Sequence, residues 1–467
     1  MYHLASHEKG KMHKTFLVQA VCLFAFLFPI FFQLSGMIFS EEGLNFNSQG
    51  NLKLVPLPLA LIFCFVGIAV LMRAGKNHFG MGFIFSAFVL MMFSTIVLTA
   101  GHGEAELSKF ILLIQFLLPM FGLVLGALYI EPEKDSLKFE AIALYILLII
   151  IPSQVVVTTI KGTVILSPSL HIFSLYQHLQ YLPLAFISLY FVAVVTLFRH
   201  RWFKYIILFL APWIGVYIAA SLSIMTILAA VVLGLISSAI LLSKEEKIWT
   251  VCLIFLLCVS FLIYYPIVKN ITTYAQKYDL SMDMSDSGGK RLSSSQNDQN
   301  KDELSSLTEN YYQRLESVKS KYGGNEIYRM LPNNIKERFI YWDFYFEGVL
   351  ENPKTFLFGH IDRPNRELYP SAHNYYLDLV YHFGFIALLP FFYLALSIIA
   401  NSVKLIRQGK LTGKLFILLT VVLFFIFVDN FLKVTFRQPY PGMVAFFLWG
   451  ILLSRLSIAT QHSRVSQ

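Results

Sequence analysis

Hydrophobic positions in this chain fall in long runs that short polar segments separate. Runs of roughly 18 or more apolar residues recur along the whole chain, and each can cross a bilayer about 30 Å thick as a helix. In a bilayer such a segment satisfies its backbone hydrogen bonds internally. The pattern therefore predicts an all-α polytopic membrane protein with about 12 transmembrane helices. The predicted spans are 15–38, 54–72, 79–100, 108–130, 139–160, 181–198, 203–220, 222–242, 248–268, 374–400, 413–432 and 439–457.

Basic residues alternate across these spans. If the N-terminus is cytoplasmic, the inside segments hold about 18 Lys and Arg residues, whereas the short outside loops hold about 5. Cytoplasmic loops are enriched in Lys and Arg. The distribution therefore predicts that both termini are cytoplasmic. The first apolar run has no small-residue cleavage site and is expected to remain as a signal anchor.

One long polar insertion divides the chain. We expect residues 1–268 to form transmembrane helices 1–9, residues 269–372 an extracytoplasmic loop, and residues 373–467 helices 10–12 with a short cytoplasmic tail. Within the loop, 281–302 is rich in Gly and Ser and almost without apolar residues, so it is predicted to be disordered. Apolar residues at three- and four-residue steps predict amphipathic helices at about 303–322 and 334–351.

Composition supports a membrane location. Of the 467 residues, 56% are hydrophobic and only 14% are charged, whereas soluble domains carry about 25% charged residues. The formal net charge of +9 is largely the cytoplasmic anchor charge. We therefore predict membrane lipid, and not nucleic acid, as a partner.

Candidate chemistry gathers just before the tenth span, in the stretch 337–390. The start of that helix directs free N–H groups and its positive dipole end toward the outer face, with Ser371 as a plausible cap. Arginine side chains can bind phosphate oxygens in a bidentate manner. The stretch is therefore an expected anion site. Its cationic and titratable residues include Arg338, Lys354, Arg363, Arg366 and His373.

A histidine at such a helix start can accept a proton from a hydroxyl. Diphosphate is a good leaving group when cations stabilise its developing charge. The residues therefore suit transfer from a lipid-linked diphosphate to an alcohol at the membrane surface. The alternative interpretations are that His373 is simply interfacial and that Arg338 reaches lipid headgroups from an amphipathic helix.

Eight positions of the same stretch form a motif: Arg338, Trp342, Pro353, Gly359, His373, Asn374, Leu377 and Gly384. This motif resembles the signature of the O-antigen ligase and O-antigen polymerase superfamily. The number of spans and the late position of the large loop agree with that family, and the motif resemblance covers roughly residues 338–390.

The resemblance implies a membrane glycosyltransferase fold of the GT-C type in a bacterial inner membrane, with the large loop periplasmic. The donor would be a glycan on undecaprenyl diphosphate. The acceptor would be another lipid-linked glycan for a polymerase, or a lipid A core sugar for a ligase. The family's histidine corresponds to His373, as general base or hydroxyl-orienting group, and its loop arginine to Arg338, as diphosphate clamp. No metal or other cofactor is implied.

The sequence departs from the family at one position. Family members often carry a Ser-Arg pair near the outer start of a middle span, where this chain reads Ala-Ser-Leu-Ser-Ile-Met over 220–225. A second phosphate-binding cation must come from elsewhere. The expected sources are Arg363, Arg366 or Lys161.

Other polar residues near the spans are candidates with structural alternatives. Asn374 is expected to bind substrate or to help cap its helix. An acid within a span usually faces a cavity, so Asp429 is expected to pair with Arg437 or to line the acceptor cleft. Asp378 and His382 lie four residues apart and suit either a relay or a packing anchor. Three further residues precede the sixth span, as surface groups or sugar ligands: His171, His178 and Gln180.

Two other functions share this pattern. A secondary transporter of about 12 spans is one, although such proteins often have two similar halves and a broken helix at the bilayer midplane. A protein O-glycosyltransferase is the other, and the short tail 454–467 argues weakly against it. The sequence does not separate ligase from polymerase.

Overall fold

The structure is a computed structural model of the whole chain. It describes residues 17–29, 31–35, 54–72, 79–100, 103–129, 138–160, 182–243, 246–286, 313–330, 333–361, 364, 369 and 371–465.

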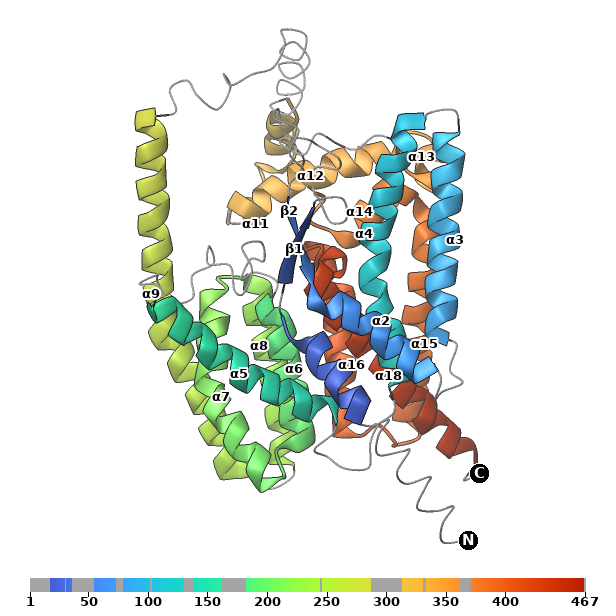
Figure 1. The fold of residues 1–467 in the computed structure, drawn as a ribbon. Helices are drawn as coiled ribbons and strands as arrows, with labels where there is room; N and C mark the ends of the chain where they lie inside the picture. Colours follow the sequence, from blue (N-terminus) through green and yellow to red (C-terminus); the bar gives the residue numbers. More distant parts are fainter. Residues whose placement is uncertain are drawn as a thin grey trace.

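The described chain is almost entirely helical (Figure 1). One pair of antiparallel strands, β1 (Phe31–Ser35) and β2 (Leu54–Pro58), is the exception. The helical elements are α2 (Leu59–Met72), α3 (Phe79–Thr99), α4 (Gly103–Leu128), α5 (Phe139–Ile160), α6 (Leu182–Leu197), α7 (Arg201–Ala220), α8 (Ile224–Leu242), α9 (Lys247–Asp286), α11 (Glu326–Met330), α12 (Asn333–Leu350), α13 (Pro353–Phe358), α14 (Tyr375–Phe383), η2 (Phe385–Leu388), α15 (Leu389–Arg407), α16 (Gly413–Phe424), the π-helical η3 (Phe425–Asp429), α17 (Asn430–Leu432), η4 (Thr435–Arg437) and α18 (Pro439–Val465).

Eight helices in the described part of the chain are long and apolar enough to cross a membrane. The expectation of an all-α, multispan membrane protein is confirmed at this level. Four shorter apolar helices correspond to the remaining predicted spans: Leu17–Leu27, Leu59–Met72, Phe139–Ser153 and Leu182–Leu197. The count of twelve spans therefore stays a prediction.

The first two predicted spans are partly wrong, because β1 and β2 occupy the end of the first and the start of the second. Pro29 follows the helix Leu17–Leu27, and proline both lacks a donor and disfavours helical geometry at the preceding residue. Two further prolines, Pro56 and Pro58, keep β2 extended.

The predicted span 374–400 is also not one continuous helix. It divides into α14, η2 and α15 at Gly384, which has a φ of +72°. A Cβ at this position would collide with the backbone of Leu357, so only glycine allows α13 to pass so close. The end of α13 is fixed by a 2.7 Å hydrogen bond from the amide of His360 to the carbonyl of Tyr381.

The loop region lies at one end of the bundle. Figure 1 shows α11 and α12 above α6 and α8, and α13 beside the upper ends of α3 and α4; we call this end the loop face. The helix α12 overlaps the predicted helix 334–351, and residues 313–322 within the other predicted helix are helical. The expectation of disorder over 281–302 is wrong for its first six residues, since α9 continues to Asp286. Residues 287–302 lie outside the described residues.

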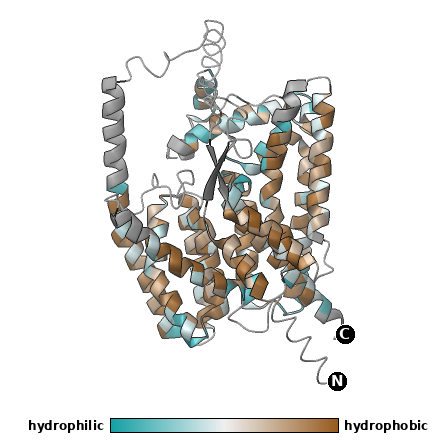
Figure 2. Cartoon of the chain, in the orientation of Figure 1, coloured by the Kyte–Doolittle hydropathy of each residue, from teal (hydrophilic) through white to brown (hydrophobic). Residues whose placement is uncertain are grey.

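Close packing of α4 on α18 holds the centre of the bundle together. A Cβ at Gly122 or Gly126 would collide with a backbone carbonyl of α18, and one at Gly450 with the carbonyl of Leu123. Small residues four apart let membrane helices approach in this way. Hydrophobic residues cover most of these helices, and hydrophilic residues gather on α12 at the loop face (Figure 2). The closely packed bundle therefore fixes the positions of the polar groups at the loop face.

Candidate functional site

Arg338 reaches from α12 into the end of the bundle. Its guanidinium donates a hydrogen bond to the carbonyl of Leu432, at the end of α17. Its charge acts on both Asp429 and Lys433. The predicted clamp residue is therefore part of a charged cluster that joins the loop helix to the helices below it.

Lys433 is the second cation of this cluster, and the sequence analysis did not single it out. It is buried, and its ammonium donates a 2.8 Å hydrogen bond to the hydroxyl of Ser223, which caps α8. The backbone carbonyl of Lys433 accepts a 3.1 Å hydrogen bond from the amide of Tyr375, at the start of α14. The ammonium thus lies beside the 220–225 segment, where the sequence lacks the expected arginine. A lysine four residues after Asp429, between two apolar runs, was the available signal.

Asp429 lies at the end of η3, a π-helical turn of the kind that is common at functional sites. The carboxylate is fully buried, and within the described chain neither oxygen has a hydrogen bond of ordinary geometry. The cations that act on it are Lys433 and Arg338. The expected pairing of Asp429 with Arg437 is wrong, because Arg437 binds Asp378 instead.

His373 lies against the same helix, α12. Its ring is half-buried and 5.7 Å from the ring of Tyr341, which is three residues along α12 from Arg338. Its amide donates a 3.3 Å hydrogen bond to the hydroxyl of Ser371. Because residues three apart share one face of a helix, His373 and the Arg338 cluster meet the same face of α12.

Asn374 caps α14, and Ser371 does not. The side-chain oxygen of Asn374 accepts hydrogen bonds from the amides of Tyr376 and Leu377, at 3.0 and 3.1 Å. The expectation that Ser371 caps this helix is wrong, because that hydroxyl instead faces the amide of His373. The cap uses the side-chain oxygen of Asn374. It also fixes the backbone direction at His373, the residue directly before the cap.

Backbone strain is concentrated at this site. Among the described residues only Leu222 and His373 are non-glycine residues with positive φ, at 43° and 46°. Such conformations cost of order 1–3 kcal/mol and tend to cluster at functional sites. Leu222 directly precedes Ser223, whose hydroxyl binds the Lys433 ammonium. His373 is the candidate base. Strain therefore marks both sides of the charged cluster.

A buried ion pair supports α14 from below. Asp378 and Arg437 are joined at 2.8 Å, and Arg437 also donates to Gln115 of α4 at 3.2 Å. His382 is 3.8 Å from the other oxygen of Asp378, and its carbonyl accepts a 2.9 Å hydrogen bond from Lys109. Because the guanidinium is the closer partner, Asp378 acts here as a packing anchor of α14.

We expect Asp378→Asn to lower the free energy of unfolding by about 3–5 kcal/mol, since it removes the counter-ion of Arg437, whose side chain is only 11% exposed. Thermal unfolding in detergent measures the change. Asp343→Asn is the control: Asp343 pairs with Arg314 at 3.4 Å and its side chain is 21% exposed, so its loss costs only about 0–1 kcal/mol. Equal midpoints for the two variants would contradict the anchor role.

Three predicted substrate-binding residues lie outside the described residues: Arg363, Arg366 and Lys161. The same holds for His171, His178 and Gln180. Over the described ranges no group of three or more His, Cys, Asp and Glu side chains is placed to hold a metal ion. Metal independence stays a prediction.

Together these residues make a site that can bind and polarise an anion. Two cations, Arg338 and Lys433, act on the same carboxylate, that of Asp429, and the Lys433 backbone contacts the start of α14. The dipole of α14 adds positive potential at this end of the helix. The Asp429 carboxylate balances one of these two charges. An imidazole, His373, is present at the same end of the same helix. This combination can hold a phosphate group and accept a proton from a neighbouring hydroxyl.

Comparisons with known proteins add no relative. No family model matches the chain, and neither a curated protein nor a solved structure is similar to it at a significant level.

Proposed function

We propose that this protein transfers a glycan from undecaprenyl diphosphate to an acceptor hydroxyl, as an O-antigen polymerase or ligase does. The single observation that carries the proposal is that Arg338 and Lys433 both act on Asp429, while the Lys433 backbone contacts the start of α14, two residues after His373. In this proposal the loop face is periplasmic, the fold is of the GT-C type with twelve spans in a bacterial inner membrane, and both termini are cytoplasmic. The acceptor is a lipid-linked glycan or a lipid A core sugar.

The charges suit a diphosphate leaving group. When the acceptor oxygen bonds to the anomeric carbon, the bond from that carbon to the diphosphate oxygen breaks, and the electron pair leaves with the diphosphate. Arg338 and Lys433 would stabilise this growing negative charge in a site of low dielectric constant. Asp429 keeps the two cations together when no ligand is bound.

The proton of the acceptor hydroxyl needs a base, and His373 is suited to that role. A neutral imidazole accepts the proton as the new glycosidic bond forms. Its strained backbone is held by the Ser371 hydrogen bond on one side and by the Asn374 cap on the other. Direct displacement at the anomeric carbon would invert its configuration.

The proposal is tested with the purified chain in proteoliposomes, supplied with undecaprenyl-diphosphate-linked glycan and an acceptor. We expect release of undecaprenyl diphosphate together with a lengthened glycan. Substrate accumulation in sealed vesicles without a new glycosidic bond would indicate the transporter instead. In a deletion strain, one repeat unit on the core indicates a lost polymerase, and long glycan on the lipid carrier indicates a lost ligase.

Donor binding is expected to depend on pH through Lys433. Burial lowers the pKa of this ammonium to about 8, with Asp429 opposing the shift and Arg338 adding to it. Only the charged form attracts diphosphate, so affinity for a prenyl diphosphate should fall above pH 8, by about tenfold per unit. Equilibrium binding between pH 7 and 9.5 measures this.

Unfolding does not explain such a loss. The unfolded chain, with the ordinary lysine pKa of 10.5, binds more protons than the folded chain between pH 8 and 10.5. The lysine term therefore increases stability as pH rises through this window. Lys433→Arg keeps its charge throughout and should flatten the profile, whereas a flat wild-type profile would refute the assignment of Lys433 as a ligand.

A further inference from the structure

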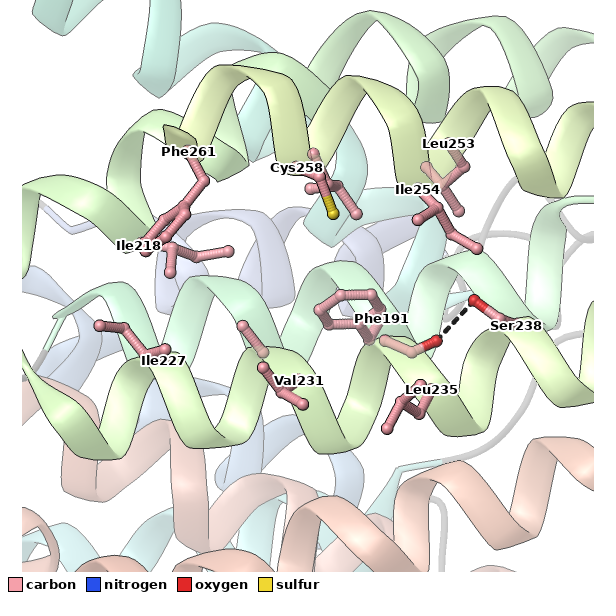
Figure 3. Close-up of a pocket in the computed structure, with 13 residues that line it drawn as sticks. Phe191, Ile218, Ile227, Val231, Leu235, Ser238, Leu253, Ile254, Cys258 and Phe261 are labelled. Atoms are coloured by element: carbon pink, nitrogen blue, oxygen red, sulfur yellow. Dashed lines mark hydrogen bonds between the residues drawn. The ribbon is translucent and has the colours of Figure 1, made fainter. Parts of the chain in front are cut away.

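An apolar groove lies between α8 and α9, with α6 and α7 behind it. Its volume is about 280 Å³, and Figure 3 shows its lining side chains pointing into the space between the two helices. Ile218 and Ile227 line one end, whereas Ser238 and Leu253 line the other. The one hydroxyl labelled there, that of Ser238, donates to the carbonyl of Gly234 at 2.7 Å. Apart from the Cys258 thiol, the groove therefore offers its occupant hydrocarbon contacts.

The groove faces the lipid side of the bundle. Large apolar side chains along its two helices are half or more exposed, including Val231 at 52% and Leu235 at 68%. Both helices are long and apolar enough to span a membrane. An occupant would therefore enter sideways from the bilayer, and it must be a hydrocarbon chain.

The length and direction of the groove relate it to the charged cluster. From Ser238 to Ile227 the helix rises about 16 Å at 1.5 Å per residue, about half of the hydrocarbon thickness. Ile227 lies one helical turn from Ser223, the hydroxyl that holds the Lys433 ammonium. The adjacent Thr226 hydroxyl is buried and, in the described chain, has no hydrogen-bond partner. The groove thus ends about one helical turn from the hydroxyl that binds the Lys433 ammonium.

We propose that this groove holds the first isoprenoid units of the donor's prenyl chain, with its diphosphate at Lys433 and Arg338. The inference rests on the proposed function, and it places the prenyl chain of the donor along α8. A long single chain with an anionic head matches one narrow groove that ends at a cation. Binding is then chain-length dependent, because a short prenyl diphosphate engages the cations and little of the groove.

Gly234→Phe tests this inference. A Cβ at Gly234 would be 3.7 Å from the ring of Phe191, an ordinary contact, so a larger side chain extends into the groove. The control is Gly82→Phe on α3, where a Cβ meets nothing within 4 Å on another apolar span. Binding of undecaprenyl diphosphate and of a short, soluble prenyl diphosphate is measured for the full chain in detergent.

We expect Gly234→Phe to weaken the long-chain ligand at least tenfold and to leave the short one unchanged, with Gly82→Phe like the wild type. If Gly234→Phe and the wild type bind the long-chain ligand equally well, the groove is not the prenyl-chain site, and the proposed function still stands. Failure of the wild type to bind either prenyl diphosphate would overturn the proposed function itself. Competition by a two-chain anionic phospholipid at equal concentration would show that the occupant is bilayer lipid. This result would also refute the groove as the prenyl-chain site.

Discussion

Replacing His373 by alanine is expected to reduce glycan transfer by about 10²–10⁴-fold, the usual contribution of a positioned general base. The imidazole is expected to act on the acceptor hydroxyl, whereas the cations bind the donor. Binding of undecaprenyl diphosphate should therefore stay close to that of the wild type. Single-turnover transfer in proteoliposomes, measured beside donor binding, separates the two effects.

A glycine variant makes this test sharper. His373 has a φ of +46°, which glycine adopts without strain, so His373→Gly should fold and leave a space where the ring was. Added imidazole should then restore part of the activity, which a purely structural histidine would not allow. His200→Ala is the control, since that exposed histidine lies between α6 and α7 at the opposite end of the bundle. Full activity of His373→Ala would exclude His373 as the general base.

Hydropathy predicted the long helices because span length and apolarity are local properties. Positions such as Pro29 and Gly384 were visible in the sequence, but their effect was not. The break at Gly384 is needed because the backbone of Leu357 passes there, and that contact belongs to the tertiary structure. Local patterns therefore predicted where helices exist, and packing decided where they end.

The site was only half predictable for a related reason. His373 and Arg338 lie in a motif that can be recognised along the chain. Lys433 is bound by Ser223, which is 210 residues away in sequence. No local pattern around either residue indicates this contact, so the sequence alone does not assign the lysine to the site. The same reasoning applies to Asp378, whose partner Arg437 is 59 residues away.

Replacing Arg338 by alanine is expected to lower the catalytic efficiency of transfer by about 10²–10³-fold, the cost of removing one donor that stabilises developing charge. Unlike the change at His373, this one should also weaken binding of the short prenyl diphosphate. Arg338→Lys keeps a charge but loses the forked geometry, so it should recover only part of the activity. Steady-state transfer and equilibrium binding measure the two effects.

The control for Arg338 is another arginine that contacts α12. Arg314 pairs with Asp343 and Glu347 on that helix, and its side chain is 27% exposed, so Arg314→Ala should retain activity. A double variant adds a further criterion, because two cations that hold one diphosphate are coupled. The combined loss in Arg338→Ala with Lys433→Ala should differ from the product of the single losses. Strict multiplicativity would mean that the two cations act on different groups, and the shared diphosphate site would be wrong.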